Sequence, residues 1–186
     1  MRTFFAIKVK PQAELLEIIE ILKKELKHEP VKWVDEQGLH LTIKFLGERS
    51  EEQVLEITNR IKTYLFASHT FTLTLEGLGI FKSNRFPRVL FVNINSNAYL
   101  NQLVSDIEDE LAAIGIEKEN RPFNPHLTIA RIKYLKDLKK FYSLIEDQKD
   151  KVHQTVTVNE IIYYNSVLKP AGPIYQELAV FPLKLL

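Results

Sequence analysis

The sequence predicts one domain built from two similar α/β lobes, and three observations lead to this fold class. Strand-like and helix-like segments alternate along the chain in two passes of similar order, which is typical of α/β lobes. The tetrapeptide His-Leu-Thr-Ile occurs at residues 40–43 and again at 126–129, once in each pass. The length of 186 residues suits one large domain or two small lobes with a shared core. We therefore expect residues 1–186 to form a single domain of two pseudo-symmetric lobes.

The first pass is divided into elements by local signals. A continuous apolar stretch predicts the first strand, and Pro11 ends it. Because proline is tolerated in the first turn of a helix, Pro11 can also open the helix that follows. Ser50 is a candidate helix N-cap, followed by an acidic first turn. The expected elements are a strand at 3–10, a helix at 13–27, a short strand at 31–34, a turn at 35–38, the first motif strand at about 39–46 and a helix at about 51–66.

The second pass begins near Phe71 and follows a similar order. Asn97 or Ser96 is expected to cap the central helix, and Gly115 is expected to end it. The expected elements are a strand at 71–75, a loop or irregular strand end at 76–81, an exposed basic loop at 82–88, a buried strand at 89–94, a helix at 99–114, the second motif strand at about 126–132, a helix at 136–145, a long strand at 152–164, a turn-rich connection at 165–173 and a last strand at 174–181.

The composition limits the classes of function. The chain has no cysteine, which excludes disulfides, thiolate metal sites and cysteine nucleophiles. The formal net charge is +1, so any site for an anion must be local. No apolar run is long enough to cross a bilayer, and the apolar N-terminal stretch is too short for a secretory signal. We expect a cytoplasmic protein without a membrane segment.

Strand periodicity predicts which side chains of the two motif strands share a face. Side chains two residues apart lie on the same face, so His40 lies with Thr42, and His126 with Thr128. The same parity places Lys44 on the face of His40 and Phe45 in the core. It places Arg131 on the face opposite His126, unless the strand twists, bulges or ends there.

Two histidines facing each other can hold opposite protonation states, because imidazole titrates near neutral pH. One then acts as a general base and the other as a general acid, a pairing that suits in-line displacement at phosphorus. Threonine hydroxyls on the same face can donate hydrogen bonds to phosphate oxygens. No glycine-rich phosphate loop is present, so side chains must hold the anion, and Lys44 and Arg131 are the nearest cations in the sequence.

Simpler interpretations of the same residues remain open at this point. The threonines can be choices of strand propensity, and the two histidines can be structural. A catalytic zinc site would need three protein ligands, and no carboxylate lies at a suitable spacing from either histidine. We therefore expect no metal and no other cofactor.

The residues around the two motifs resemble those of the 2H phosphoesterases, and most closely the RNA 2′,3′-cyclic phosphodiesterases, also called 2′-5′ RNA ligases. The resemblance covers the whole chain and includes both motifs in order with their flanks. The matching segments are Phe4–Ile7, Trp33–Val34, His40–Gly47, Pro87–Phe91, Phe123–Arg131 and Gly172–Tyr175.

This resemblance implies an α+β fold of two duplicated lobes, with two antiparallel sheets flanking a central cleft and the helices outside. It implies metal-independent hydrolysis of a terminal 2′,3′-cyclic phosphate to a 2′-phosphomonoester. Carried onto this chain, it makes His40 and His126 the catalytic pair and gives phosphate binding to Thr42, Thr128 and Arg131. We expect His40 to be the acid towards the 3′ oxygen and His126 the base for water.

The expected partners are RNA ends or small cyclic nucleotides and oligonucleotides, bound by a monomer. Candidate RNA contacts are Lys44, Phe123, Arg85 and Arg88, through phosphate charge and base stacking. Two other functions stay open on the same fold. One is a non-catalytic module that binds nucleotides or RNA ends, and the other is 2′-5′ RNA ligation.

Overall fold

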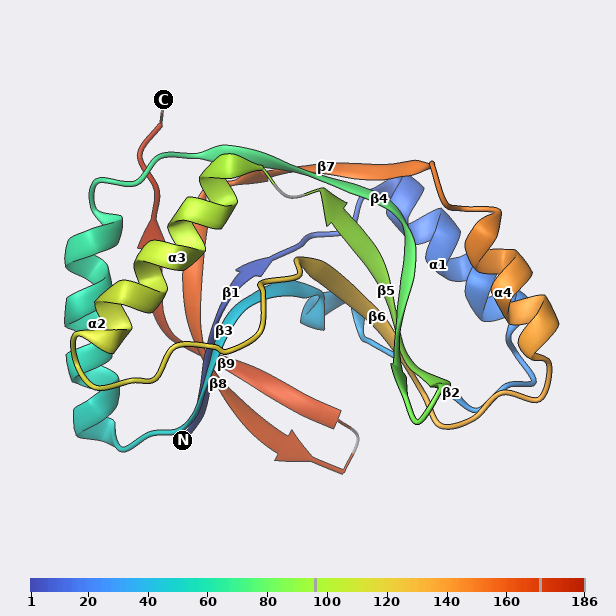
Figure 1. The fold of residues 1–186 in the computed structure, drawn as a ribbon, viewed down its shortest axis with the longest axis horizontal. Coiled ribbons are helices and arrows are strands. Elements are labelled where there is room, and N and C mark those ends of the chain that lie inside the picture. Colours follow the sequence, from blue (N-terminus) through green and yellow to red (C-terminus); the bar gives the residue numbers. More distant parts are fainter. Residues whose placement is uncertain (96, 171, 186) are drawn as a thin grey trace.

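The computed structural model describes residues 1–95, 97–170 and 172–185, and within them nine strands form one antiparallel sheet (Figure 1). The sheet order is β7-β4-β5-β6-β3-β1-β8-β9, with β2 pairing on β6. The strands are β1 (Arg2–Lys8), β2 (Val31–Trp33), β3 (His40–Glu48), β4 (Phe71–Ser83), β5 (Phe86–Asn95), β6 (His126–Ile132), β7 (Val152–Val158), β8 (Glu160–Lys169) and β9 (Gly172–Pro182).

The two motif strands, β3 and β6, lie at the centre of this order and join its two halves. Their register pairs Leu41 with Leu127, and the two halves are linked over a short length around this pair. The expected α+β fold is confirmed, with the refinement that the two antiparallel sheets are hydrogen-bonded into one.

The helices form two pairs, and each pair combines the first and second halves of the chain (Figure 1). Helices α2 (Glu51–Leu65) and α3 (Ala98–Ala112) are joined by a hydrogen bond from the Tyr64 hydroxyl to Asp106. Helices α1 (Ala13–Glu25) and α4 (Leu138–Glu146) are joined by the ion pair of Glu25 with Lys140. None of the described helices is long and apolar enough to span a membrane.

Capping explains where the central helices begin. Ser50 accepts a hydrogen bond from the Gln53 amide, and the Gln53 side chain accepts one from the Ser50 amide, which completes a capping box at α2. Asn97 accepts from the Leu100 amide at the start of α3, and Ser96 lies outside the described residues.

Two segments expected to be loops consist mostly of strand residues. The expected basic loop at 82–88 is the tip of a hairpin between β4 and β5, where Asn84 and Arg85 have positive φ angles of 50° and 70°. Most of the connection expected at 165–173 is also strand, because β8 and β9 pair as far as Lys169 and Gly172; Ala171 lies outside the described residues. The expected long strand at 152–164 is divided at Asn159 into β7 and β8.

Helices cover one face of the central sheet and create the main core there. Fully buried side chains of the motif strands, Leu41 and Leu127, belong to this core together with Leu15, Ile61 and Ile107 from the helices. Burial of such side chains on one face fixes which side chains of β3 and β6 must lie on the other. We call that other face, which carries His40 and His126, the histidine face.

Candidate active site

The histidine face brings four of the expected site residues to the junction of β3 and β6. Because the strands are antiparallel and Leu41 pairs with Leu127, His40 lies across from Thr128 and Thr42 across from His126. All four side chains are half-buried, while Leu41 and Leu127 between them are fully buried. This arrangement places two imidazoles and two hydroxyls around one point of the sheet.

Both imidazoles are held by the same local hydrogen bond. Nδ1 of His40 lies 2.7 Å from the carbonyl oxygen of Gly38, and Nδ1 of His126 lies 2.7 Å from that of Asn124. A carbonyl oxygen only accepts, so Nδ1 carries the hydrogen in each ring. Nε2 is therefore the nitrogen that can take or give a proton, and it is so on both histidines.

Aromatic rings flank each histidine. Tyr175 of β9 meets the His40 ring edge-on at a centroid distance of 4.9 Å, and Phe4 of β1 lies at 5.2 Å. Phe81 of β4 meets the His126 ring edge-on at 4.7 Å, and Phe91 of β5 lies at 5.2 Å. These contacts restrict the rotation of both rings.

The surroundings of His40 affect its titration. Burial lowers the pKa of His40, and the nearby positive charges of His126 and Arg131 lower it further, against the upward effect of the hydrogen bond to Gly38. His40 therefore favours its neutral form in the free protein. The same charge interactions place Arg131 near His40.

Arg131 reaches the histidine face because β6 contains a β-bulge. The register with β5 passes from Phe91–Thr128 to Leu90–Ala130, which leaves Ile129 as an extra residue. One extra residue shifts the alternation by one position, so Arg131 points away from the core with His126 and Thr128. The bulge thus resolves the conflict between strict strand parity and a role for Arg131 beside the histidines.

An equivalent bulge in β3 overturns two expectations. The register with β1 passes from Ala6–Thr42 to Phe5–Lys44 and leaves Ile43 as the extra residue. Lys44 was expected on the histidine face, but it is 3% exposed on the core side. Phe45 was expected in the core, but it is 59% exposed on the histidine face. Both expectations are wrong because strict alternation does not pass through a bulge.

The buried ammonium group of Lys44 is fully engaged. Its Nζ donates to both carboxylate oxygens of Glu108 at 2.8 Å and to the carbonyl oxygen of Glu117 at 2.9 Å. The carboxylate of Glu108 also accepts from the amide of Glu119 at 3.2 Å. Lys44 thus anchors the segment that leads to His126 onto α3, and its charge is neutralised away from the histidine face.

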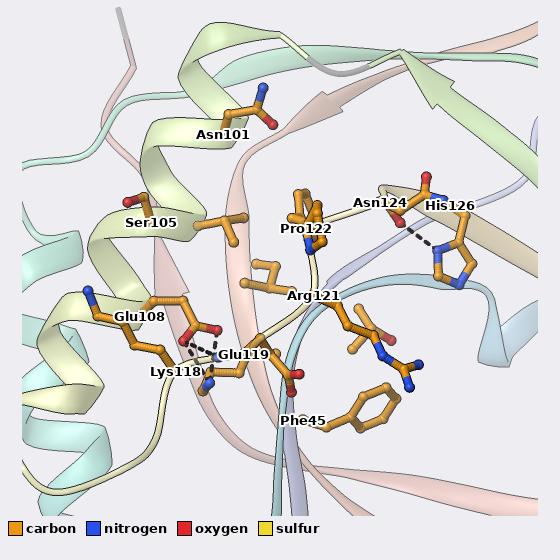
Figure 2. A pocket seen from close by; sticks show the side chains of 15 residues that line it. Phe45, Asn101, Ser105, Glu108, Lys118, Glu119, Arg121, Pro122, Asn124 and His126 are labelled. Carbon is orange, nitrogen blue, oxygen red and sulfur yellow. Dashed lines mark hydrogen bonds and ion pairs between the residues drawn. The ribbon is translucent and has the colours of Figure 1, made fainter.

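A groove of about 730 Å³ lies beside His126 and Thr42, between β3, α3 and the segment before β6. Its walls include Phe45, Phe123 and Arg121. Figure 2 shows the side chain of Arg121 extending from the segment before His126 toward Phe45. Phe123, a candidate RNA contact, lines the same groove as His126, and its contact with RNA stays a prediction. Phe45 and Arg121 were not among the expected site residues. Phe45 was missed because the bulge in β3, which exposes it, leaves no recognisable pattern in the sequence.

The other two candidate RNA contacts lie at the β4–β5 hairpin. Arg85 is at the exposed tip, and Arg88 donates a hydrogen bond to the carbonyl oxygen of Lys133. Arg88 is itself the extra residue of a bulge between the pairs Phe81–Val89 and Lys82–Pro87. The structure therefore does not gather these two arginines at the histidines.

Within residues 1–95, 97–170 and 172–185, no three His, Asp or Glu side chains gather in an arrangement that could hold a metal ion.

Known proteins resemble this chain over nearly its whole length. The RNA 2′,3′-cyclic phosphodiesterase of Thermotoga maritima is 36% identical over 179 residues, which cover 96% of this chain and 93% of that protein. The protein of the same name from Methanocaldococcus jannaschii is 34% identical over 176 residues, covering 95% and 97%.

Solved structures share the fold. The protein TT0787 of Thermus thermophilus has a TM-score of 0.79 at 27% identity, covering 99% of this chain and 98% of that one. E. coli LigT, solved in complex with 3′-AMP, has a TM-score of 0.74 at 27% identity, covering 98% and 97%. The model of the LigT like phosphoesterase family matches residues 7–91 and again residues 92–175, once on each half. The resemblance expected from the two motifs is confirmed, and the chain belongs to the LigT-like phosphoesterase family.

Proposed function

We propose that this protein hydrolyses the 2′,3′-cyclic phosphate at an RNA end, or on a small nucleotide, to a 2′-phosphomonoester. The observation that carries the proposal is the matched pair of histidines, each with Nδ1 bound to a carbonyl oxygen and Nε2 left for proton transfer. The names of the relatives from T. maritima and M. jannaschii support the same reaction.

The two Nε2 atoms supply a complete pair of proton transfers. A neutral histidine takes a proton from water as the water oxygen forms its bond to phosphorus. The bond from phosphorus to the 3′ oxygen breaks, and the protonated histidine gives its proton to that oxygen. The products are a 3′ hydroxyl and a 2′-phosphate, and the two histidines end with exchanged protonation states.

Burial lowers the pKa of His40 and so favours its neutral form. A group that is neutral in the free protein is suited to be the base, so we assign His40 as the base and His126 as the acid. This is the reverse of the assignment expected from the sequence. A substrate with sulfur in place of the 3′ oxygen tests it, because a thiolate leaves without an acid. Such a substrate should restore turnover to His126→Ala and leave His40→Ala inactive.

Phosphate binding is proposed for Thr42, Thr128 and Arg131. The hydroxyls of both threonines lie on the histidine face and can donate to the non-bridging oxygens. Arg131 places a permanent cation near His40, where negative charge grows during the displacement. The proposed proton transfers and phosphate contacts are all supplied by side chains of this chain.

The groove beside His126 is proposed to hold the nucleoside. Its volume of about 730 Å³ and its aromatic walls, Phe45 and Phe123, suit a flat base that stacks. E. coli LigT has been solved with 3′-AMP, an adenine nucleotide with a phosphate at the same end of the ribose. We further propose a cytoplasmic monomer, which size-exclusion chromatography with light scattering can test for its oligomeric state.

Hydrolysis of a nucleoside 2′,3′-cyclic phosphate in excess EDTA tests the proposed function. We expect parental turnover without added metal and a loss of about 10²–10⁴-fold in His40→Ala and in His126→Ala. His28→Ala, an exposed histidine outside the site, is the matched control. Parental rates in both site variants would contradict the mechanism. Affinity for a 2′-phosphate end without turnover of any cyclic phosphate would show a binding module instead.

A further inference from the structure

Lys32, which no expectation from the sequence included, lies directly beside Arg131. In the register of β2 and β6, Lys32 pairs with Arg131, and its neighbours Val31 and Trp33 pair with the buried Ile132 and Ala130. Opposed residues of an antiparallel pair project to the same face. Lys32 therefore projects to the histidine face, and its side chain is exposed.

This pair of cations ends a row of opposed residues that begins at Phe81. Phe81, which contacts the His126 ring, pairs with Val89, and Val89 pairs with Arg131. Lys32 is thus one strand beyond Arg131 on the same face, and opposed Cα atoms of antiparallel strands are about 4.5–5.5 Å apart. Lys32 is therefore farther along this row from Phe81 than Arg131 is.

The hairpin of β8 and β9 borders the same position. A Cβ atom built on Gly172 would lie 3.6 Å from Nζ of Lys32, so β9 begins beside this ammonium group. Tyr175 of the same strand contacts the His40 ring. Lys32 therefore lies beside the strand that also carries Tyr175, at the rim of the site.

Within the described part of the chain, the two charges at this position have no carboxylate partner. Like charges directly opposed on neighbouring strands repel each other. Among the described residues, neither Lys32 nor Arg131 forms an ion pair with a carboxylate, unlike Lys44. Each of these two unpaired cations can neutralise one phosphate of a nucleic acid strand.

The opposite side of the site has a different character. In β3, Phe45 occupies the position equivalent to that of Arg131 in β6. The Phe45 side chain lines the groove proposed for the nucleoside. A terminal nucleotide has two groups besides its cyclic phosphate, the base and the 5′ phosphate. The aromatic side suits the base, and the cationic side suits the phosphate.

We infer that Lys32 binds the 5′ phosphate of the terminal nucleotide, so that the substrate class is an RNA strand rather than a free nucleoside cyclic phosphate. This inference rests on the proposed function and adds the direction in which the strand leaves the site. Arg131 holds the cyclic phosphate, and Lys32 holds the next phosphate along the chain.

Two substrates that differ in one group test this inference. One is a nucleoside 2′,3′-cyclic phosphate, and the other is the same compound with a 5′ phosphate. The parent should prefer the 5′-phosphorylated compound in kcat/KM, and Lys32→Ala should lower that preference about tenfold, the usual effect of one charged hydrogen bond. Lys32→Arg should restore it. Lys62→Ala on α2 makes the same charge change away from the site and should keep the parental preference.

Salt dependence and binding provide independent readouts. For a short RNA with a cyclic phosphate end, the slope of log(kcat/KM) against log salt should become less steep by about 0.7 in Lys32→Ala, the contribution of one phosphate on a single strand. In a binding assay, Lys32→Ala should weaken adenosine 3′,5′-bisphosphate about tenfold more than it weakens 3′-AMP.

The outcomes separate this inference from the proposed function. An equal preference in the parent and in Lys32→Ala, with turnover intact, would overturn the role of Lys32 alone. Absence of turnover in the parent would overturn the proposed reaction, and the bisphosphate comparison would still decide whether Lys32 binds the 5′ phosphate.

Discussion

Phe45 and Arg131 occupy equivalent positions in the two motif strands, each five residues after the motif histidine, and both project from the histidine face. Each position depends on a bulge at the isoleucine of the repeated tetrapeptide, Ile43 in β3 and Ile129 in β6. The burial of the first seven residues alternates identically in both strands, including the two consecutive buried residues that mark the bulge.

This equivalence explains how a duplicated frame produces an asymmetric site. The histidines, the threonines and the bonds to Gly38 and Asn124 are the same on both sides. The side chain after the bulge differs, an aromatic ring on one side and a cation on the other. The proposed acid–base pair thus has an aromatic side chain on one side and a cation on the other.

The exposure of Phe45 predicts a small effect on stability. Phe45→Ala should lower the free energy of unfolding by less than about 1 kcal/mol, because the ring is 59% exposed and leaves no core cavity. Phe5→Ala, at a fully buried position on the neighbouring strand, should cost about 3–5 kcal/mol. Denaturant unfolding of both variants gives the comparison. Equal losses would mean that Phe45 belongs to the core.

The motif strands and the helix starts could be predicted from the sequence because they depend on local signals, whereas the antiparallel α+β arrangement was implied by the family resemblance. The Ser50 capping box and the apolar faces of α1 and α3 are of this kind. The bulges could not be predicted, since Ile43 and Ile129 look like any alternating strand residue. These bulges determine to which face of the sheet the following side chains, such as Lys44, project.

The arrangement of the helices was also beyond local signals. Pairing of α1 with α4, and of α2 with α3, depends on the order of strands in the sheet, which is set by long-range contacts. The two passes predict equivalent halves, but they do not say that helices of different halves pack together.

The buried ion pair of Lys44 with Glu108 predicts a large loss when one partner is removed. Lys44→Met leaves the carboxylate of Glu108, only 13% exposed, without its cation. The free energy of unfolding should fall by about 3–5 kcal/mol, and the double variant Lys44→Met, Glu108→Leu should recover most of it.

Lys118→Met is a matched control for that ion pair. Lys118 also pairs with an acid of α3, Asp109, but both side chains are more than half exposed. Its loss should cost less than about 1 kcal/mol. Similar costs for Lys44→Met and Lys118→Met in denaturant unfolding would show that burial of the first pair does not matter.

The lowered pKa of His40 predicts how stability changes with pH. Below pH 6.5, the pKa of about 6.5 in the unfolded chain means that His40 binds a proton there, whereas His40 in the folded protein stays neutral because its pKa is lowered. The free energy of unfolding should therefore fall as the pH drops from about 6.5 to the folded pKa of His40, and be constant in this respect above 6.5.

Denaturant unfolding between about pH 5 and 8 measures this effect. His40→Gln should show a weaker fall in stability than the parent. Part of the fall should persist, because burial also lowers the pKa of His153, with a further contribution from the charge of Lys151. The same pH profile in the parent and in His40→Gln would be inconsistent with a lowered pKa at His40.

Gly79 tests whether the aromatic rings around His126 set its position. A Cβ atom at this glycine would lie 2.3 Å from the ring of Phe91, which packs at a centroid distance of 5.2 Å from His126. Gly79→Ala should push the Phe91 ring towards the imidazole and displace Nε2. Displacements of about 1 Å cost up to 10²-fold, so kcat should fall at least about tenfold.

The change at Gly79 can be separated from general unfolding by a second substitution. Phe91→Leu combined with Gly79→Ala removes the ring atoms that the new methyl group meets, and it should restore part of kcat. Circular dichroism of the single variant should match the parent, because the ring tip can move without opening the sheet. If Gly79→Ala keeps parental kcat, then Phe91 does not position His126, and the bond to Asn124 with the edge-on contact of Phe81 holds the imidazole.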